Sequence, residues 1–174
     1  EARRLLMRGL DETVALGVKT NQAFLRRCLA HPVFAAGDAT TAFIGQQGEV
    51  LMRGDATAAQ RGMALAAVLL QETALGASQR GLRRSLAHAL PMRLSFDLAG
   101  KRQEVVLTEG QAHCFQVEAA GQRYVIEMLK VDGARARFIV DGVMEHAWFH
   151  RDGDRLGLHY AGQAFDIVDT TRVT

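Results

Sequence analysis

The chain has 174 residues, of which 48% are hydrophobic and 23% charged, so it is long and apolar enough for one or two globular domains and does not resemble a disordered chain. Its 21 basic and 19 acidic residues leave a net charge of +2, and no basic run gathers them, so nothing favours nucleic-acid binding. No signal peptide or transmembrane stretch is visible, and we expect no membrane partner. Cys28 and Cys114 lie far apart in the sequence and fit buried, reduced thiols better than a disulfide framework.

The N-terminal part of the chain predicts two helices. Residues 1–16 carry apolar side chains at helical spacing, and Gly17 is expected to end this helix. A second helix is expected over residues 21–30, with Pro32 either stopping it or starting the next turn. The helical pattern already runs at the first residue, which is not Met, so we expect the chain to be a piece of a longer protein.

Residues 45–55 contain three glycines and a pair of glutamines, which is typical of a linker. A long helix is expected next, over residues 57–75, with Asp55 and Thr57 as candidate N-caps. Residues 63–70 contain no polar side chain. Apolar residues in every direction around a helix axis indicate burial on all sides, so the rest of the chain must enclose this helix.

Residues 76–88 form a more basic stretch. It fits a short amphipathic helix with Leu82 and Leu86 on one face, or equally a solvated connector. The sequence leaves both possibilities open.

From Met92 onward the apolar pattern changes to a period of two, which is typical of strands. Seven turn signals, about 9 to 12 residues apart, divide this segment into eight short strands. Each signal ends in a glycine: Gly100, Gly110, Gly121, Gly133, Gly142, Gly153 and Gly162. The spacing leaves no room for helices and predicts an antiparallel meander.

Residue pairing across the turns tests whether the strands share one apolar face. Two-residue turns ending in Gly100, Gly121, Gly142, Gly153 and Gly162 all place apolar residues opposite apolar residues. The turn at Gly153, for example, would pair Phe149 with Leu156 and make His146 and His159 cross-strand neighbours. The turns at Gly110 and Gly133 fail this test, so we expect a bulge or an odd-length loop at these two corners.

Closure into a barrel stabilises a meander with one apolar face, because it removes the unpaired strand edges and buries that face. The sequence therefore predicts an α+β protein: a small helical segment, then an eight-stranded antiparallel β-barrel wrapped around the long central helix.

The predicted register turns Trp148, the single tryptophan, to the outside of the barrel. Four candidate partner-binding residues lie on this face: His146, Trp148, His150 and His159. Exposed Trp residues are enriched where proteins bind partners, although Trp148 could equally lie flat on the barrel wall under a neighbouring segment. No further ligand completes a zinc site with these histidines, and no serine or cysteine lies in the context of a catalytic nucleophile.

The first 44 residues resemble the C-terminal end of the biotin carboxylase domain in the α subunits of biotin-dependent acyl-CoA carboxylases, of the 3-methylcrotonyl-CoA, geranyl-CoA and propionyl-CoA types. The resemblance rests on the ordered stretches EARRLLMRGLDET, GVKTNQAFL, HPVF and GDATTAFI. The matching residues are Gly17, Thr20, Asn21, His31, Pro32, Phe34, Gly37, Asp38, Thr41, Phe43 and Ile44.

The remainder is similar to the next domain of the same subunits, the intersubunit (BT) domain, in which a barrel surrounds a long helix. The ending DGDRLGLHYAGQAFDIVD looks like the closing hairpin of that domain. The resemblance implies a biotin carboxylase tail at residues 1–45, a linker at 46–55 and the BT domain at 56–174.

In such enzymes, the resemblance implies, ATP, bicarbonate and Mg²⁺ carboxylate biotin on the α subunit, and a carboxyltransferase β subunit then carboxylates the acyl-CoA. We expect no catalytic, cofactor-binding or metal-binding residue in this piece, and assign it the docking of the α subunit to the β subunit. The implied partners are the β subunit and the biotin carboxylase and biotin carrier domains of the same chain. The implied location is the cytoplasm, or the mitochondrial matrix in a eukaryote.

Lys130 follows Met128 at a distance of two residues but lacks the second methionine of a biotin carrier motif, so we do not expect it to carry biotin. An alternative from another class is a stand-alone barrel that binds a small ligand, similar to lipocalins. The apolar helix argues against it, because residues 63–70 would fill the space that a ligand needs.

Overall fold

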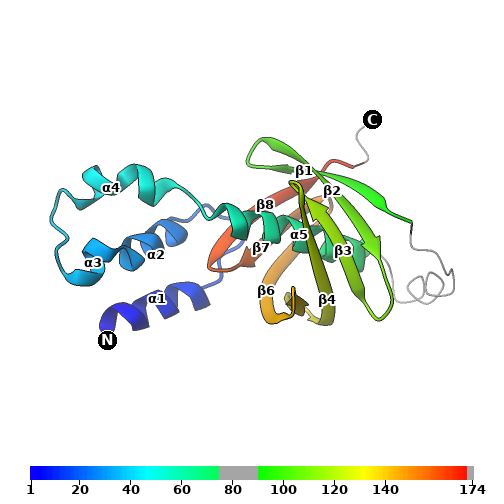
Figure 1. The fold of residues 1–174 in the computed structure, drawn as a ribbon, viewed down its shortest axis with the longest axis horizontal. Helices are drawn as coiled ribbons and strands as arrows, with labels where there is room; N and C mark the ends of the chain where they lie inside the picture. Colours follow the sequence, from blue (N-terminus) through cyan, green and yellow to red (C-terminus); the bar gives the residue numbers. More distant parts are fainter. Residues whose placement is uncertain (75–89, 172–174) are drawn as a thin grey trace.

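The computed structural model describes residues 1–74 and 90–171 and contains a helical unit followed by a closed β-barrel (Figure 1). The helices are α1 (Ala2–Glu12), α2 (Gln22–Ala30), α3 (Pro32–Ala36), α4 (Phe43–Met52) and α5 (Ala56–Ala74). The strands are β1 (Met92–Leu98), β2 (Lys101–Glu109), β3 (Cys114–Ala119), β4 (Gln122–Asp132), β5 (Arg135–Val140), β6 (Val143–Asp152), β7 (Arg155–Tyr160) and β8 (Gln163–Asp169). This confirms the predicted fold class. The stretch 76–88 lies outside the described residues.

The helical unit, α1 to α4, follows the predicted order with different helix ends. The first helix stops at Glu12, four residues before the predicted end, and Thr13 is already extended. Pro32 is the first residue of α3, where its missing N–H costs nothing. His31 caps that helix, since its Nδ1 accepts a hydrogen bond of 3.3 Å from the Val33 amide.

Most of the segment predicted as a linker, residues 45–55, is helical, because α4 extends through Met52. Phe43 and Leu51 on this helix are buried together with Cys28 of α2. Each glycine in a helix costs roughly 1 kcal/mol, whereas burying one large apolar side chain contributes about 1.5–3 kcal/mol. Burial of the two side chains therefore offsets the glycines, and only residues 53–55 connect the helical unit to α5.

The long helix α5 is enclosed by the barrel, as predicted. Residues 63–70 are all buried, with exposed fractions of 0% to 4%. Of the two N-cap candidates, Asp55 caps the helix, because its Oδ1 accepts hydrogen bonds from the amides of Thr57 and Ala58 at 2.9 and 3.1 Å. At the other end, Arg151 of β6 donates hydrogen bonds to the Leu70 carbonyl (3.2 Å) and the Thr73 hydroxyl (2.8 Å), which ties the helix to the barrel wall.

The barrel is closed, with the eight strands in sequence order and β1 paired to β8. The predicted pairings at Gly100, Gly121, Gly142 and Gly162 are confirmed. The pairing at Gly153 is wrong by two residues: Phe149 lies opposite Leu158, and Trp148 opposite His159. The turn there consists of Gly153 and Asp154 rather than Asp152 and Gly153. A shift of two residues keeps each side chain on the predicted face, but His146 no longer lies opposite His159.

The predicted irregularity is found at the Gly110 corner, whereas near Gly133 it lies inside β4 and not at the corner. Between β2 and β3 the last pair is Glu109 with Phe115, so an odd number of residues separates them. Between β4 and β5 the register shifts between Met128 and Lys130, which places a β-bulge at Leu129. The bulge lies within the strand rather than in the turn at Gly133.

The barrel has a solid core. Side chains of α5 form one buried cluster with inward residues of all eight strands, including Phe96, Phe115 and Phe138, each at most 1% exposed. An added Cβ at Gly62 would lie 3.1 Å from the ring of Phe165, so helix and strand approach each other at this glycine. In the part of the chain that the structure describes, no helix is both long and apolar enough to span a membrane.

Candidate interaction surface

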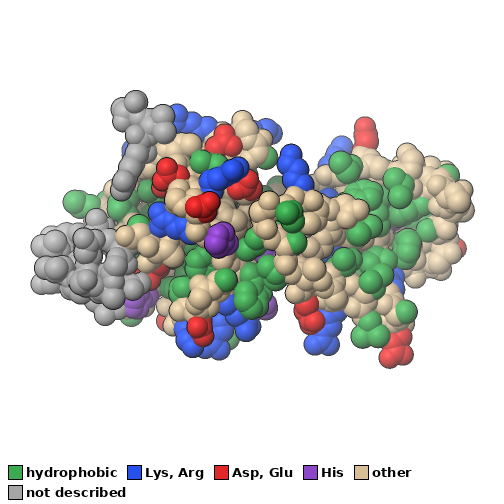
Figure 2. Space-filling model, turned by 180° about the vertical axis from the view of Figure 1, so that it is seen from behind, with side chains coloured by type: hydrophobic (Ala, Val, Ile, Leu, Met, Phe, Trp, Pro, Cys, Tyr) green, Lys and Arg blue, Asp and Glu red, His purple; other side chains and the backbone are tan. Residues whose placement is uncertain are grey.

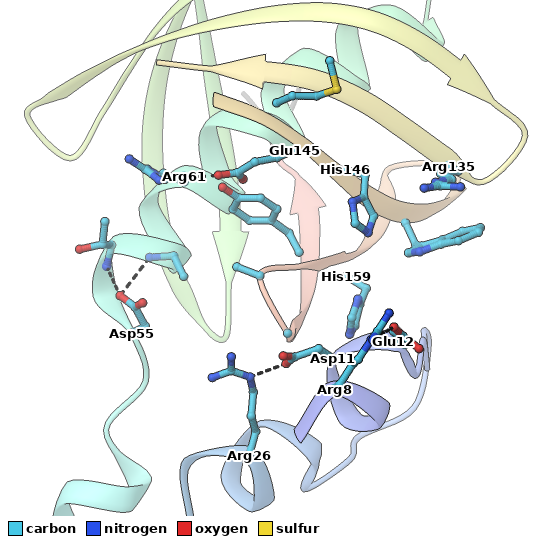
Figure 3. A pocket seen from close by; sticks show the side chains of 17 residues that line it. Arg8, Asp11, Glu12, Arg26, Asp55, Arg61, Arg135, Glu145, His146 and His159 are labelled. Carbon is cyan, nitrogen blue, oxygen red and sulfur yellow. Dashed lines mark hydrogen bonds and ion pairs between the residues drawn. The ribbon is translucent and has the colours of Figure 1, made fainter. Parts of the chain in front are cut away.

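An open groove of about 950 Å³ separates the helical unit from the outer wall of the barrel (Figure 3). Beside this groove the helical unit contacts β7, β8 and the turn between them. An added Cβ at Gly157 would lie 3.6 Å from Cβ of Leu16, and one at Gly162 would lie 2.7 Å from Oδ1 of Asp11. Helix α1, the first turn of α5 and strands β5 to β7 line the space beside this contact.

Three of the four predicted partner-binding residues line the groove, namely His146, Trp148 and His159. Trp148 is half-buried, and its cross-strand partners are Arg135 on β5 and His159 on β7. His146 is exposed and lies opposite Arg137. His150 is exposed and lies outside the groove.

Sequence reasoning missed the two arginines of β5. The guanidinium of Arg135 lies 5.4 Å from the centroid of the Trp148 ring, a cation–π contact. Arg137 is also exposed and on the same outer face. The alternation in the sequence ARARFIV was the available signal, because it places both arginines outward once Ala136 and Phe138 face the core.

His159 was predicted on the outer face of the barrel, and its side chain is there, but it is covered. Only 4% of the residue is exposed, and its Nε2 has no hydrogen-bond partner among the described residues. Burial lowers the pKa of His159, and His146 lowers it further, while Asp11 of α1 opposes the shift. His159 is therefore a neutral imidazole at the base of the groove and offers little surface to a partner.

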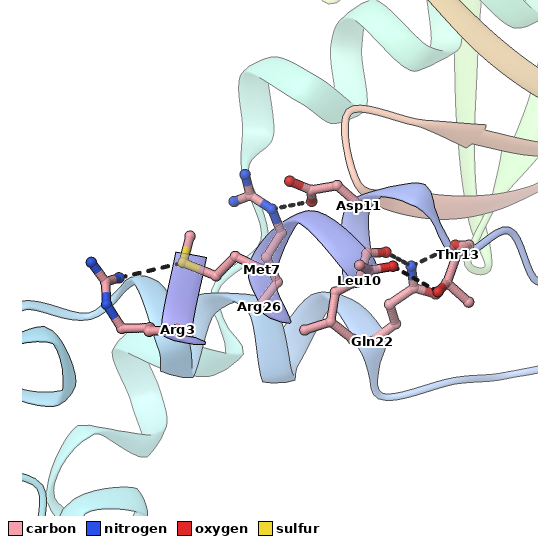
Figure 4. A network of polar contacts seen from close by, with 8 residues as sticks. Arg3, Met7, Leu10, Asp11, Thr13, Gln22 and Arg26 are labelled. Carbon is pink, nitrogen blue, oxygen red and sulfur yellow. Dashed lines mark hydrogen bonds and ion pairs between the residues drawn. The ribbon is translucent and has the colours of Figure 1, made fainter. Parts of the chain in front are cut away.

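Polar contacts between α1 and α2 set the position of the groove's helical wall (Figure 4). Gln22 at the start of α2 donates hydrogen bonds to the carbonyls of Leu10 and Thr13, the second at 2.6 Å. Arg26 of α2 forms an ion pair with Asp11. Partly exposed pairs of this kind contribute on the order of 1 kcal/mol or less, so they orient the helices more than they stabilise them.

Tyr160 interacts with Glu145 and Arg61, and Figure 3 labels the latter two residues. Burial and a hydrogen bond with Glu145 raise the pKa of the Tyr160 hydroxyl. Arg61 of α5 approaches Asp141 and Glu145 at 3.8 and 4.0 Å, which links the helix to the strand ends.

The side chains on the outer wall of the barrel suit the recognition of other groups. Within residues 1–74 and 90–171, no cluster of three or more histidine, cysteine or acidic side chains could hold a metal ion. Cys28 and Cys114 are free thiols, and of the two only Cys28 is buried as predicted. What the outer wall presents is guanidinium, imidazole and indole groups, which bind carboxylates and aromatic or apolar side chains.

A second surface with binding character lies on the helical unit, where large apolar side chains stay exposed (Figure 2). Those at least half exposed are Leu5, Leu6, Val18, Ile44, Val50 and Met52. Neither α1 nor α3 buries a single residue. Helices with apolar faces left open in this way are typical of units that pack against further protein.

No family model matches the chain. Over 70 residues the chain is 41% identical to the methylcrotonoyl-CoA carboxylase subunit alpha, mitochondrial, of Dictyostelium discoideum. The match covers 40% of this chain and 10% of that protein, so the chain spans about a tenth of the length of the curated relative it matches. The match supports a relationship between this chain and the α subunits of biotin-dependent carboxylases.

Proposed function

We propose that the chain is a piece of the α subunit of a biotin-dependent acyl-CoA carboxylase and that its barrel docks this subunit onto the carboxyltransferase β subunit. The observation that carries the proposal is the filled interior of the barrel. Residues 63–70 of α5 occupy the centre of the barrel, so binding must use the outer surface.

The helical unit supports an arrangement in two parts. Its exposed apolar side chains fit a segment that completes its core against a larger domain. We assign residues 1–45 to the end of the biotin carboxylase domain and residues 56–174 to the intersubunit domain. Helix α4 begins in the first of these parts and runs through Met52 toward the second.

In the whole enzyme, ATP, Mg²⁺ and biotin would act at sites outside this chain. The part assigned here is mechanical, because docking fixes the distance that the biotin carrier must cover between two active sites. A carrier tethered over a matched distance meets its second site at a high effective concentration, whereas a wrong distance removes that advantage.

The alternative of a stand-alone ligand-binding barrel gains no support from the structure. Small-molecule sites are usually concave and mostly apolar, and in lipocalin-like barrels they occupy the interior. Here that interior holds α5. Titration with apolar fluorophores separates the two functions, since saturable binding at low micromolar concentration would favour the ligand-binding barrel.

Co-purification tests the proposed function. We expect the 174-residue chain to be retained by the immobilised carboxyltransferase subunit of the same organism. The matched control is the Leu69→Asp variant, in which a carboxylate enters the barrel core and the docking surface is lost with the fold. Equal retention of both chains, or retention of neither, would contradict docking through the folded barrel.

A further inference from the structure

The outer wall of β5 and β6 carries a compact group of cationic and aromatic side chains, which we call the basic–aromatic patch. Its members are Arg135, Arg137, His146, Trp148 and His150. The strands are paired so that Arg135 lies opposite Trp148 and Arg137 opposite His146. The patch therefore forms one continuous surface rather than scattered side chains.

Neither arginine of the patch has an acidic partner in the described part of the chain, a feature that they share with the exposed Arg93 of β1 and Arg102 of β2. Among the described residues, no ion pair reaches Arg135 or Arg137, whereas Arg123 pairs with Glu118 at 2.5 Å and Arg155 with Asp166 at 3.1 Å. The acidic side chain opposite Arg135 is Asp132, and it pairs with Lys130. Two uncompensated guanidinium groups thus face outward side by side.

A shallow hollow of about 240 Å³ lies next to the patch, lined by Lys130, Asp132, Arg135 and Arg137. Three of these four side chains are cations. A hollow of this size and charge fits carboxylate groups, and guanidinium binds carboxylate through two parallel hydrogen bonds.

The spacing of the arginines selects the kind of carboxylate ligand. Alternate residues of a strand lie roughly 6.6–6.8 Å apart on one face, and an extended peptide presents its own alternate side chains at the same distance. Trp148 adds a half-buried aromatic surface, and its ring is in cation–π contact with Arg135. Trp residues are among those that contribute most to the binding energy of protein interfaces.

We infer that the basic–aromatic patch binds an acidic segment of a partner protein. Alternate carboxylates of the segment lie on Arg135 and Arg137, and an apolar side chain of the segment packs on Trp148. A nucleic acid is the weaker fit, because the chain has only a small net charge of +2 and its basic residues do not extend into a longer track. The inference rests on the proposed function in one respect: the segment is expected on the carboxyltransferase subunit.

Trp148 is the only tryptophan, so intrinsic fluorescence reports binding at the patch directly. The probe is a ten-residue peptide in which Glu alternates with Ser, except that one of the Glu positions is occupied by Leu. The control peptide is identical but has Gln in place of each Glu. We expect a saturable fluorescence change with the Glu peptide alone, and weaker binding as salt rises.

Matched variants locate the site. The double substitution Arg135→Gln and Arg137→Gln should weaken binding of the Glu peptide at least tenfold, while Arg123→Gln on β4 should leave it unchanged. Equal binding of the Glu and Gln peptides, equal binding by the double variant, or tighter binding of a ten-nucleotide oligothymidylate would each overturn the inference.

Capture by the carboxyltransferase subunit then separates the inference from the proposed function. We expect the double variant to lose at least tenfold in affinity for that subunit. If the subunit binds wild type and double variant equally, docking stands and the patch is not its site. If the Glu peptide binds but the wild-type chain captures no carboxyltransferase, the patch stands and the proposed function fails.

Discussion

Arg135 on β5 holds its guanidinium 5.4 Å from the ring centroid of Trp148, its cross-strand partner on β6. A contact of this kind contributes about 0.5–1 kcal/mol at an exposed site, so it orients the indole more than it stabilises the barrel. Because this contact adds little to the stability of the barrel, Trp148→Ala should leave the melting curve nearly unchanged. Because Trp side chains carry much of the binding energy at interfaces, the same variant should weaken capture of the carboxyltransferase subunit by about 1–4 kcal/mol.

The matched control for this prediction is Val125→Ala on the outer face of β4, a residue that is 43% exposed. It should alter neither capture nor melting. Full-strength capture by Trp148→Ala, or a large loss of its thermal stability, would show that the indole supports the fold rather than an interface.

Leu69→Asp should unfold the barrel. Leu69 is fully buried in α5, and an unpaired carboxylate there costs several kcal/mol, a large share of a typical stability of about 5–15 kcal/mol. Circular dichroism during heating measures the effect. Leu6→Asp, at a position of α1 that is 56% exposed, is the control and should melt close to wild type. An unchanged melt of Leu69→Asp would mean that the barrel does not enclose the helix.

Gly62→Leu should destabilise the chain by about 1–3 kcal/mol, because the new side chain meets the buried ring of Phe165. The same substitution at Gly9, an exposed position of α1 with nothing within 4 Å of an added Cβ, should be neutral or stabilise by up to about 1 kcal/mol. Urea unfolding of both variants gives the comparison. Equal stability of the two would contradict the close packing of α5 on β8.

The stability of the chain should fall as the pH drops below about 6.5, the ordinary pKa of histidine, and His159 should account for part of the fall. Burial lowers the pKa of His159 in the folded chain. Below pH 6.5 the unfolded chain therefore binds more protons at this histidine than the folded chain does, and the free energy of unfolding rises with pH in that range. The groups that face it are Asp11 and His146.

Urea unfolding at a series of pH values between 5 and 7.5 measures this slope. His159→Gln should flatten it, whereas His150→Gln, at an exposed position, should not. An identical slope in wild type and His159→Gln would show that the imidazole is not held neutral in the folded chain.

Much of the fold could be predicted from the sequence, because burial leaves a pattern. Residues 63–70 are apolar in every direction and the strands alternate with a period of two, so enclosure and closure both follow. Helix α4 could not be predicted, since its stability comes from Phe43 and Leu51 packing on Cys28, a contact distant in sequence. The turn at Gly153 was placed wrongly because glycine fits either position of a two-residue turn.

The candidate site was harder to predict than the fold. The sequence placed Trp148 and the histidines on the outer face correctly, because alternation alone decides the face. It could not show that His159 is buried and lies within the electrostatic reach of Asp11, since these two residues come from opposite ends of the chain. It also gave no reason to choose Arg135 and Arg137, because only the assembled strands show which arginines lack acidic partners.

Competition during assembly tests the docking function most directly. Intact α and β subunits of the carboxylase would be mixed with increasing amounts of the 174-residue chain, and the assembled complex measured by sedimentation velocity. We predict that excess chain displaces the α subunit in a saturable way and that the Leu69→Asp variant does not. Complete assembly in the presence of a large excess of folded chain would contradict the proposal that the barrel docks the two subunits.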